Sequence, residues 1–247
     1  MILGRRSFEV FCQTTSGTDK IDWDARVYEG YLMTVVDAPG VGDTRHNEQE
    51  GMDILQIRIK EAMLLSPEGY DVFLYVIKYG DRFRQEDVKV LESLKTIFGS
   101  DFVKKRCILI LTGGDSFEKD RRDHRKTFEE WCQAEVGDFG TLLRECDNRV
   151  VLFDNMTEDE SKRRDQLARL FYQIENLNER NQNERYTDNN FETAKAQRSE
   201  NVDRQHKILT KLGSSVLKIP VESNPPTLVL VQIYRAMRTL PSAKFIV

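Results

Sequence analysis

Acidic and glycine residues follow an apolar run in the stretch TVVDAPGVGDT, residues 34–44. Asp37 stands directly after the run, where a carboxylate can help to hold a Mg²⁺ ion on the phosphates of a nucleotide. Gly40 has no side chain, so its backbone N–H can approach a terminal phosphate closely. The alternative is that Asp-x-Pro-Gly is only a turn at the end of a strand.

A second apolar run ends in LILTGGDSF, which places Asp115 just beyond it. A carboxylate at this point can accept hydrogen bonds from both N1–H and N2–H of guanine, and adenine offers no such pair of donors. Gly113 and Gly114 would leave room for a flat ring. The alternative is a common Gly-Gly-Asp turn.

A third run ends in RVVLFDNMTEDE, where Asp154 and Asn155 follow directly. Asn155 could contact the base or position the loop beneath it. Thr157 and Glu160 have the spacing of a capping box, so a helix start is the alternative for Thr157, and it leaves Asn155 free. Three consecutive strand ends with suitable groups indicate a nucleotide site more specifically than any one of them.

The elements that must position these residues alternate along the chain. Short apolar runs predict buried strands at 31–36, 72–77, 107–111 and 150–153. Apolar residues at three-to-four spacing predict helices at 52–65, 86–98, 124–136 and 161–177, the second of them stopped by Gly99. This alternation predicts an α/β fold, a parallel sheet with helices on both faces, in which ligands bind beyond the carboxyl ends of the strands.

The bulk properties exclude several classes of protein. Net charge is −4 over 247 residues and mean hydropathy is −0.55, so neither a nucleic-acid surface nor a transmembrane segment is indicated. The start of the chain lacks the long apolar region of a signal peptide. Four widely spaced cysteines without a C-x-x-C pair suit a reduced, cytoplasmic protein in which the thiols are small core residues.

Five segments of the chain resemble successive blocks of the immunity-associated GTPases, the GIMAP or AIG family. The resemblance covers residues 1–177, and CDNRVVLFDN is its most diagnostic block. The blocks keep the family's order and spacing: ILGRRSF, VVDAPGVGDT, LYVIKYGDRFRQEDVKVLESLKTIFG, ILILTGGDSFE and CDNRVVLFDNMTEDESK.

The resemblance implies a P-loop NTPase-like domain, related to septins, that binds GTP and Mg²⁺ and forms homo- or hetero-oligomers with related GTPases. It implies roles for residues at matching positions: Thr18 and Asp37 as Mg²⁺ ligands, Gly40 at the phosphate, Asp115 at guanine, Asn155 near the base, and Arg82 as a catalytic residue acting in trans. A Ser-Gly-Thr turn is the alternative for Thr18, and a solvated helix start is the alternative for Arg82.

The sequence departs from the family pattern at the N-terminal end of the chain. The phosphate-binding motif G-x-x-x-x-G-K-[ST] occurs nowhere in the chain, and MILGRRSF resembles the segment that follows it. We therefore expect a G domain at residues 1–177 that lacks its first strand and phosphate loop. The alternative is an active enzyme whose recorded sequence starts at the wrong methionine.

The missing strand would be the central one, so its neighbours would expose facing edges. Residues 178–247 are expected to be a polar linker and tail, partly disordered or helical, in which TLVLVQIY (227–234) is the remaining strand-like run. We expect this run to fill the gap. The alternative is that it stays loose.

Hydrolysis is expected to be slow or absent, because Val41 stands where Ras-like enzymes use a glutamine to orient water. The sequence thus predicts a guanine-nucleotide-binding protein with weakened nucleotide affinity and no meaningful GTPase activity. The alternative is a nucleotide-independent interaction module that uses the surface around residues 82–98 to regulate assembly of full-length relatives.

Overall fold

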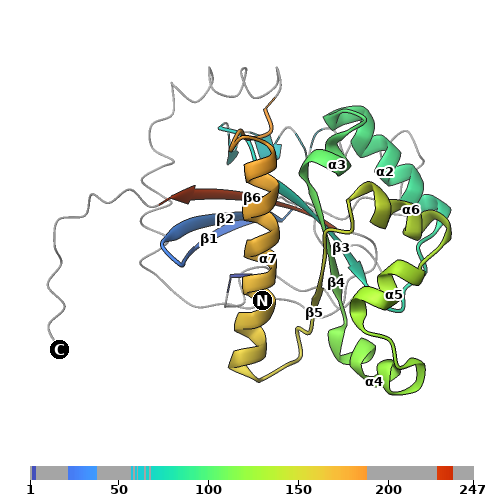
Figure 1. Ribbon diagram of the computed structural model, residues 1–247. Helices are drawn as coiled ribbons and strands as arrows, with labels where there is room; N and C mark the ends of the chain where they lie inside the picture. The colour runs from blue at the N-terminus through green and yellow to red at the C-terminus, as the bar shows by residue number, and fades with distance from the viewer. Residues whose placement is uncertain are drawn as a thin grey trace, which may run out of the picture.

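The computed structural model describes residues 2–3, 22–37, 57, 59, 61–63, 65–66, 68–187 and 227–235. Six strands of this part form one sheet in the order β1-β2-β6-β3-β4-β5, shown in Figure 1. The strands are β1 (Asp22–Tyr28), β2 (Tyr31–Asp37), β3 (Val72–Lys78), β4 (Cys107–Thr112), β5 (Val150–Phe153) and β6 (Thr227–Arg235). All five strand-like runs expected from the sequence are therefore strands.

The sheet is mixed, which corrects the expectation of a parallel sheet. β3, β4 and β5 pair in parallel. β6 lies antiparallel to both β2 and β3, so β2 points the same way as β3. The carboxyl ends of β2, β3, β4 and β5 consequently share one rim, while β1 and β6 run the other way.

Strand β1 was not expected from the sequence. It forms a hairpin with β2 through Glu29 and Gly30, whose φ angles of 49° and 81° are both positive. Two central residues with positive φ are typical of the turn type that matches strand twist in two-residue hairpins. Glu-Gly is a weaker signal for this turn than Asn-Gly, and Asp24 and Arg26 interrupt the apolar pattern of the strand.

Strand β6 fills the centre of the sheet, as expected for the C-terminal apolar run. Its Val229 is the register partner of Asp37, and its Thr227 is the partner of Val76. The start of β6 therefore lies at the rim where β2 and β3 end. Residues 227–235 thus close a gap between two strands that come from the first third of the chain.

Helices cover both faces of the sheet, as predicted. α7 (Glu160–Arg180) crosses one face in Figure 1, and its Leu170 and Ile174 are fully buried in a cluster with Leu74 and Ile110. The other face carries α2 (Gln85–Phe98) and α3 (Phe102–Arg106). These helices share a second cluster with alternate residues of β3 and β4.

The helix expected at 124–136 is shorter in the structure, and the helix before it was not expected from the sequence. α4 (Gly114–His124) ends at Arg125, whose φ of 55° is left-handed, and α5 (Phe128–Ala134) begins after it. Thr127 and Glu130 form a capping box that starts the new helix. α6 (Gly137–Glu145) follows. The helix expected at 52–65 is seen in its described residues, where Ile59 is buried.

The packed domain continues past residue 177. α7 extends to Arg180, and the following turn returns Tyr186 to the sheet, where its backbone exchanges two hydrogen bonds with Tyr70. Arg185 lies 3.3 Å from the Asp71 carboxylate. Among the described residues, no helix has the length and apolar character needed to span a membrane.

Candidate nucleotide site

The loops after β3, β4 and β5 touch one another at the shared rim. The backbone N–H of Tyr79 donates to the carbonyl of Thr112 over 2.8 Å. The Tyr79 ring meets Phe117 and Trp131 edge-on, and burial together with a hydrogen bond to Asp120 raises the pKa of its hydroxyl. Tyr79 therefore anchors the first of these loops to the helix that carries Asp115.

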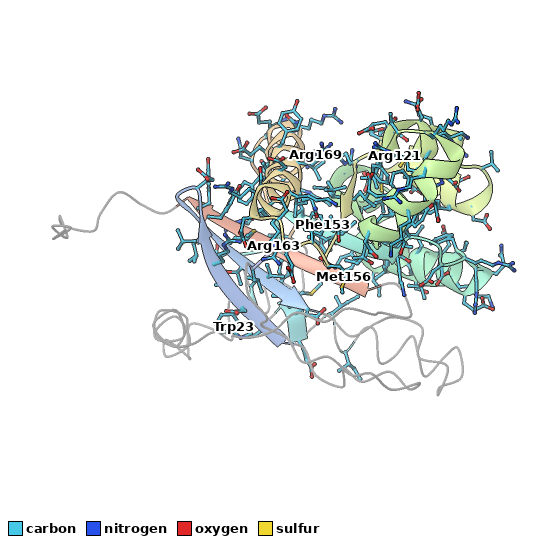
Figure 2. All side chains as sticks on the ribbon, turned by 90° about the horizontal axis from the view of Figure 1, so that it is seen from below. Trp23, Arg121, Phe153, Met156, Arg163 and Arg169 are labelled. Atoms are coloured by element: carbon cyan, nitrogen blue, oxygen red, sulfur yellow. The ribbon has the colours of Figure 1, made fainter. Side chains whose placement is uncertain are left out.

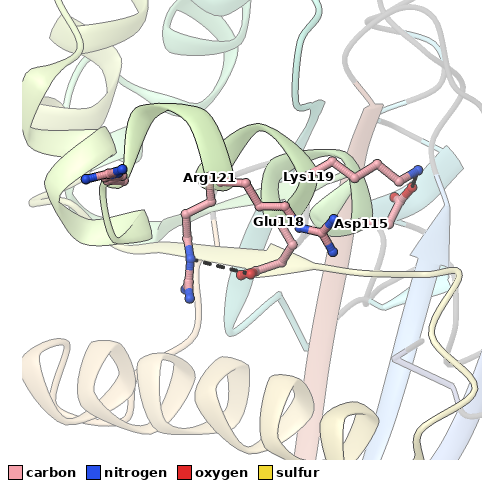
Figure 3. Close-up of a pocket in the computed structure, with 6 residues that line it drawn as sticks. Asp115, Glu118, Lys119 and Arg121 are labelled. Carbon is pink, nitrogen blue, oxygen red and sulfur yellow. Dashed lines mark ion pairs between the residues drawn. The ribbon is translucent and has the colours of Figure 1, made fainter.

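Asp115 lies in the first turn of α4, directly beyond β4. Its carboxylate is 3.6 Å from Nζ of Lys119, one turn along the helix, as Figure 3 shows. Asp115 borders a surface hollow formed by charged side chains. The others are Glu118, Lys119, Arg121, Arg122 and Arg125. The hollow is lined by α4 and the residue after it, and neither Asn155 nor Asp37 is among its lining residues.

The two glycines before Asp115 have packing roles, which changes the interpretation made from the sequence. Gly113 has a φ of 82° and lies against Tyr79. A Cβ on Gly114 would lie 2.9 Å from the backbone nitrogen of Asp154. In the structure the absence of a side chain at Gly114 brings the β4 and β5 loops together, rather than leaving room for a ring.

Asp154 organises the loop that carries Asn155. Its buried carboxylate accepts hydrogen bonds from the N–H groups of Met156 and Thr157, and it pairs with Nζ of Lys162 at 2.6 Å. Figure 2 labels Phe153, the last residue of β5, and Met156 in the turn that follows it. The turn leaves Asn155 partly exposed beside the Asp115 loop.

The alternative interpretation of Thr157 as the residue that caps a helix start is wrong, because the helix begins two residues further along the chain. The N-cap of α7 is Asp159, whose carboxylate accepts from the N–H groups of Ser161 and Lys162. The Thr157 hydroxyl instead accepts from the N–H of Asp159. A carboxylate nearer to the helix competes better for its first N–H groups, and Asn155 stays outside this capping arrangement.

Asp37 ends β2 at the same rim, on the far side of β6. In the order β2-β6-β3-β4, three strand spacings separate Asp37 from the loop after β4, a distance of about 14 Å across the sheet. The other residues expected at the phosphates and the metal, Thr18 and Gly40, lie outside the described residues, as does Val41. Within the described ranges, no group of three or more acidic, histidine or cysteine side chains is placed to hold a metal.

Arg82 is exposed in the loop between β3 and α2. It lies three residues before the first residue of α2, whose N-cap is Arg84. The structure thus places Arg82 at the surface near the rim, in the position expected for a solvated residue ahead of a helix.

Arg149 holds together the segment CDNRVVLFDN, residues 146–155, which is the most diagnostic block of the resemblance. This buried guanidinium donates to the carbonyls of Cys107, Val103 and Lys104, and to the Asp147 carboxylate at 3.2 Å. Arg149 precedes β5, so it lies at the end of the sheet opposite the rim. Its role is to join α3, β4 and β5.

Sequence reasoning missed Tyr79, the Asp154–Lys162 pair and Gln166 as organisers of the site. The side chain of Gln166 accepts from the backbone N–H of Asp154 at 2.9 Å. Gln166 lies within an amphipathic helix, where a polar residue normally indicates the solvated face. Its burial was therefore not evident from spacing alone.

Comparison with known proteins identifies the family of the chain. The sequence profile of the AIG1 family matches residues 1–206. Immune-associated nucleotide-binding protein 10 of Arabidopsis thaliana is 29% identical over 210 residues, covering 84% of this chain and 43% of the relative. Immune-associated nucleotide-binding protein 9 of the same plant is 29% identical over 191 residues, covering 77% and 53%. The chain thus spans about half the length of these curated relatives, and it belongs to the AIG1 family.

Proposed function

We propose that this chain is a guanine-nucleotide-binding protein of the AIG1 type that binds nucleotide weakly. The observation that supports it is the close contact of Gly114 with Asp154, which brings the loops of Asp115 and Asn155 together at the rim where Asp37 also lies. The relatives are named as nucleotide-binding proteins. AIG1 membership implies guanine as the base.

Asp115 is the proposed reader of the base. Its carboxylate is about one-third exposed, and its pairing with Lys119 at 3.6 Å is a surface contact. Such pairs contribute roughly 0–1 kcal/mol, so guanine N–H groups can replace the lysine at little cost. Asn155 is proposed to border the base from the neighbouring loop.

Asp37 is proposed to help hold Mg²⁺, with Thr18 as the second protein ligand. Mg²⁺ sites on nucleotides use one or two carboxylates, with phosphate oxygens and water completing the shell. A single carboxylate at the end of β2 fits this donor set, so the described residues agree with a metal held mainly by the nucleotide.

Weak binding is proposed because the sequence offers no substitute for the phosphate loop. In the sequence, the residues that immediately precede β6 are Pro225 and Pro226. Proline has no N–H group to donate to a phosphate. Each charge-assisted contact to the phosphates that is missing costs roughly 1.5–3 kcal/mol, so affinity falls by orders of magnitude.

Titration of the 247-residue chain with a fluorescent guanine nucleotide, with and without Mg²⁺, tests the proposal. We expect weak binding that Asp115→Ala abolishes and that the exposed control Asp138→Ala leaves unchanged. Micromolar or tighter binding that depends on Mg²⁺ would contradict the weakening. Equal responses of the two variants would contradict the role of Asp115.

The second candidate is a nucleotide-independent interaction module, and the proline pair ahead of β6 favours it. α2 would supply the surface, because Lys89, Glu92 and Thr96 remain exposed along it. Co-purification with a full-length relative, unchanged by added GTP, would support this function. Loss of the complex on removal of GTP would argue for the nucleotide-dependent one.

A further inference from the structure

The slot between β2 and β3 is filled by a strand from the far end of the chain. β6 pairs along one edge from Tyr31 to Asp37 and along the other from Val72 to Val76. If β6 left, both edges would present unpaired N–H and C=O groups in the middle of the sheet. Such edges are templates for pairing with another strand.

The sequence of β6 suits a position that is covered on both faces. Val36, Leu230 and Phe73 are register partners in one row across the three strands. Val36 and Phe73 belong to the cluster beneath α2. The adjacent row has Val35 and Val72, both in the cluster beneath α7, with Val231 between them. A near-continuous apolar run such as LVLV is typical of a strand buried on two sides.

One polar residue of β6 has a polar register partner in β2. Gln232 interrupts the apolar run of β6, and its register partner is Thr34, the buried polar residue of β2. A shift of one residue would move every side chain of β6 to the opposite face. A shift of two would place Gln232 opposite Leu32 or Val36. The sequence pattern therefore favours the observed register.

The connection to β6 is much longer than the fold requires. Tyr186 pairs with Tyr70, just before β3 begins, whereas Thr227 lies at the opposite rim. The height of the sheet between them is about 23 Å for a seven-residue strand. The 39 residues from 188 to 226 could reach at most about 130 Å. This length suffices to deliver β6 to a neighbouring molecule.

We propose that residues 227–235 are an exchangeable donor strand, and that the β2–β3 slot is an interaction surface for the same strand of a second copy of this chain. Exchange uses identical contacts in both arrangements, so the concentration of the protein selects between them. A tethered strand has an effective concentration on the order of millimolar, so the closed monomer dominates in dilute solution. Exchanged dimers form when concentrated protein is refolded.

Single-cysteine variants of the full chain test this exchange in a Cys12→Ser background. One variant carries Thr34→Cys and the other carries Gln232→Cys. Register partners in antiparallel strands have Cα atoms about 4.5–5.5 Å apart, which suits a disulfide. The two variants are mixed in urea, refolded and oxidised, and the products are separated without reductant. We expect a disulfide-linked dimer of the two variants whose yield rises with protein concentration.

Three further variants make every outcome decisive. The double variant Thr34→Cys with Gln232→Cys is expected to form an internal disulfide in dilute solution, and Val36→Cys with Leu230→Cys serves if it does not fold. The control Ile233→Cys, one residue out of register, is expected to give little dimer with Thr34→Cys. An internal disulfide without any mixed dimer, or equal dimer yield from Ile233→Cys, would overturn the proposal. Guanine nucleotide is omitted throughout, so failure of the proposed function leaves this test intact.

Discussion

Gly114 lies against Asp154 so closely that a methyl group on Gly114 would be 2.9 Å from the backbone nitrogen of Asp154. The Asp154 backbone cannot retreat easily, because its N–H donates to Gln166 and its carboxylate is paired with Lys162. The two loops proposed to read guanine are thus fixed relative to each other by a missing side chain and a buried carboxylate.

Replacing Gly114 with alanine is therefore expected to destabilise the domain. A methyl group in a tightly packed position forces backbone shifts that cost about 1–3 kcal/mol. Urea unfolding followed by circular dichroism measures the loss. Ser116→Ala, in the same helix, is the control and is expected to change stability by less than about 0.5 kcal/mol. A Gly114→Ala protein as stable as the parent would show that the two loops can separate freely.

Arg149 and Arg180 form a matched pair, because both guanidinium groups contact the same Asp147 oxygen. Arg149→Met removes the buried guanidinium that donates to three backbone carbonyls, two of them in buried hydrogen bonds, so we expect a loss of about 3–5 kcal/mol. Arg180 is exposed, and Arg180→Met is expected to cost at most about 1 kcal/mol. Chemical denaturation of both variants compares them, and similar losses would mean that Arg149 acts only through Asp147.

Tyr186 tests whether the residues after α7 belong to the domain. Its ring meets Phe73 and Phe98 edge-on, with centroids 5.5 and 5.4 Å away. Tyr186→Ala is expected to lower the free energy of unfolding by about 2 kcal/mol through lost packing. Tyr172→Ala removes an exposed ring from α7 and is the control. If thermal unfolding of the two variants coincided, the domain would end before Tyr186.

Apolar runs predicted the strands well, because burial on both faces leaves little ambiguity over four to eight residues. This holds even for β6, whose apolar run predicts a strand in the gap of the sheet and pairs there with β2 and β3. The direction in which each strand runs in the sheet could not be predicted in the same way. β6 runs antiparallel to β2 and β3, whereas an apolar run carries no information on the direction in which a strand will pair.

The candidate site was only partly predictable. Asp37, Asp115 and Asn155 were located because each follows an apolar run, and the structure places all three at the same rim. The contacts that hold the loops were not found, since they depend on Gly114 and Gln166 approaching Asp154 from separate elements. Such contacts leave no periodic signal in the sequence.

Three buried cysteines predict a loss of stability at alkaline pH. Burial raises the pKa of the Cys132 and Cys146 thiols to about 12, and it also raises the pKa of the Cys107 thiol. An unfolded thiol ionises near pH 8.5. Above that pH the unfolded state binds fewer protons than the folded state, so the free energy of unfolding falls as pH rises toward 12. The stabilisation is complete below about pH 8.5.

Cys146→Ala isolates the contribution of one thiol. Between about pH 8 and 10, ionisation of the unfolded Cys146 thiol is expected to remove about 2 kcal/mol from the parent protein and nothing from the variant. The stability difference between the two proteins should therefore shrink by that amount, while lysine and tyrosine titration affects both alike. Guanidinium unfolding at the two pH values measures it. A difference that stays constant with pH would mean that the Cys146 thiol ionises as readily in the folded protein as in the unfolded chain.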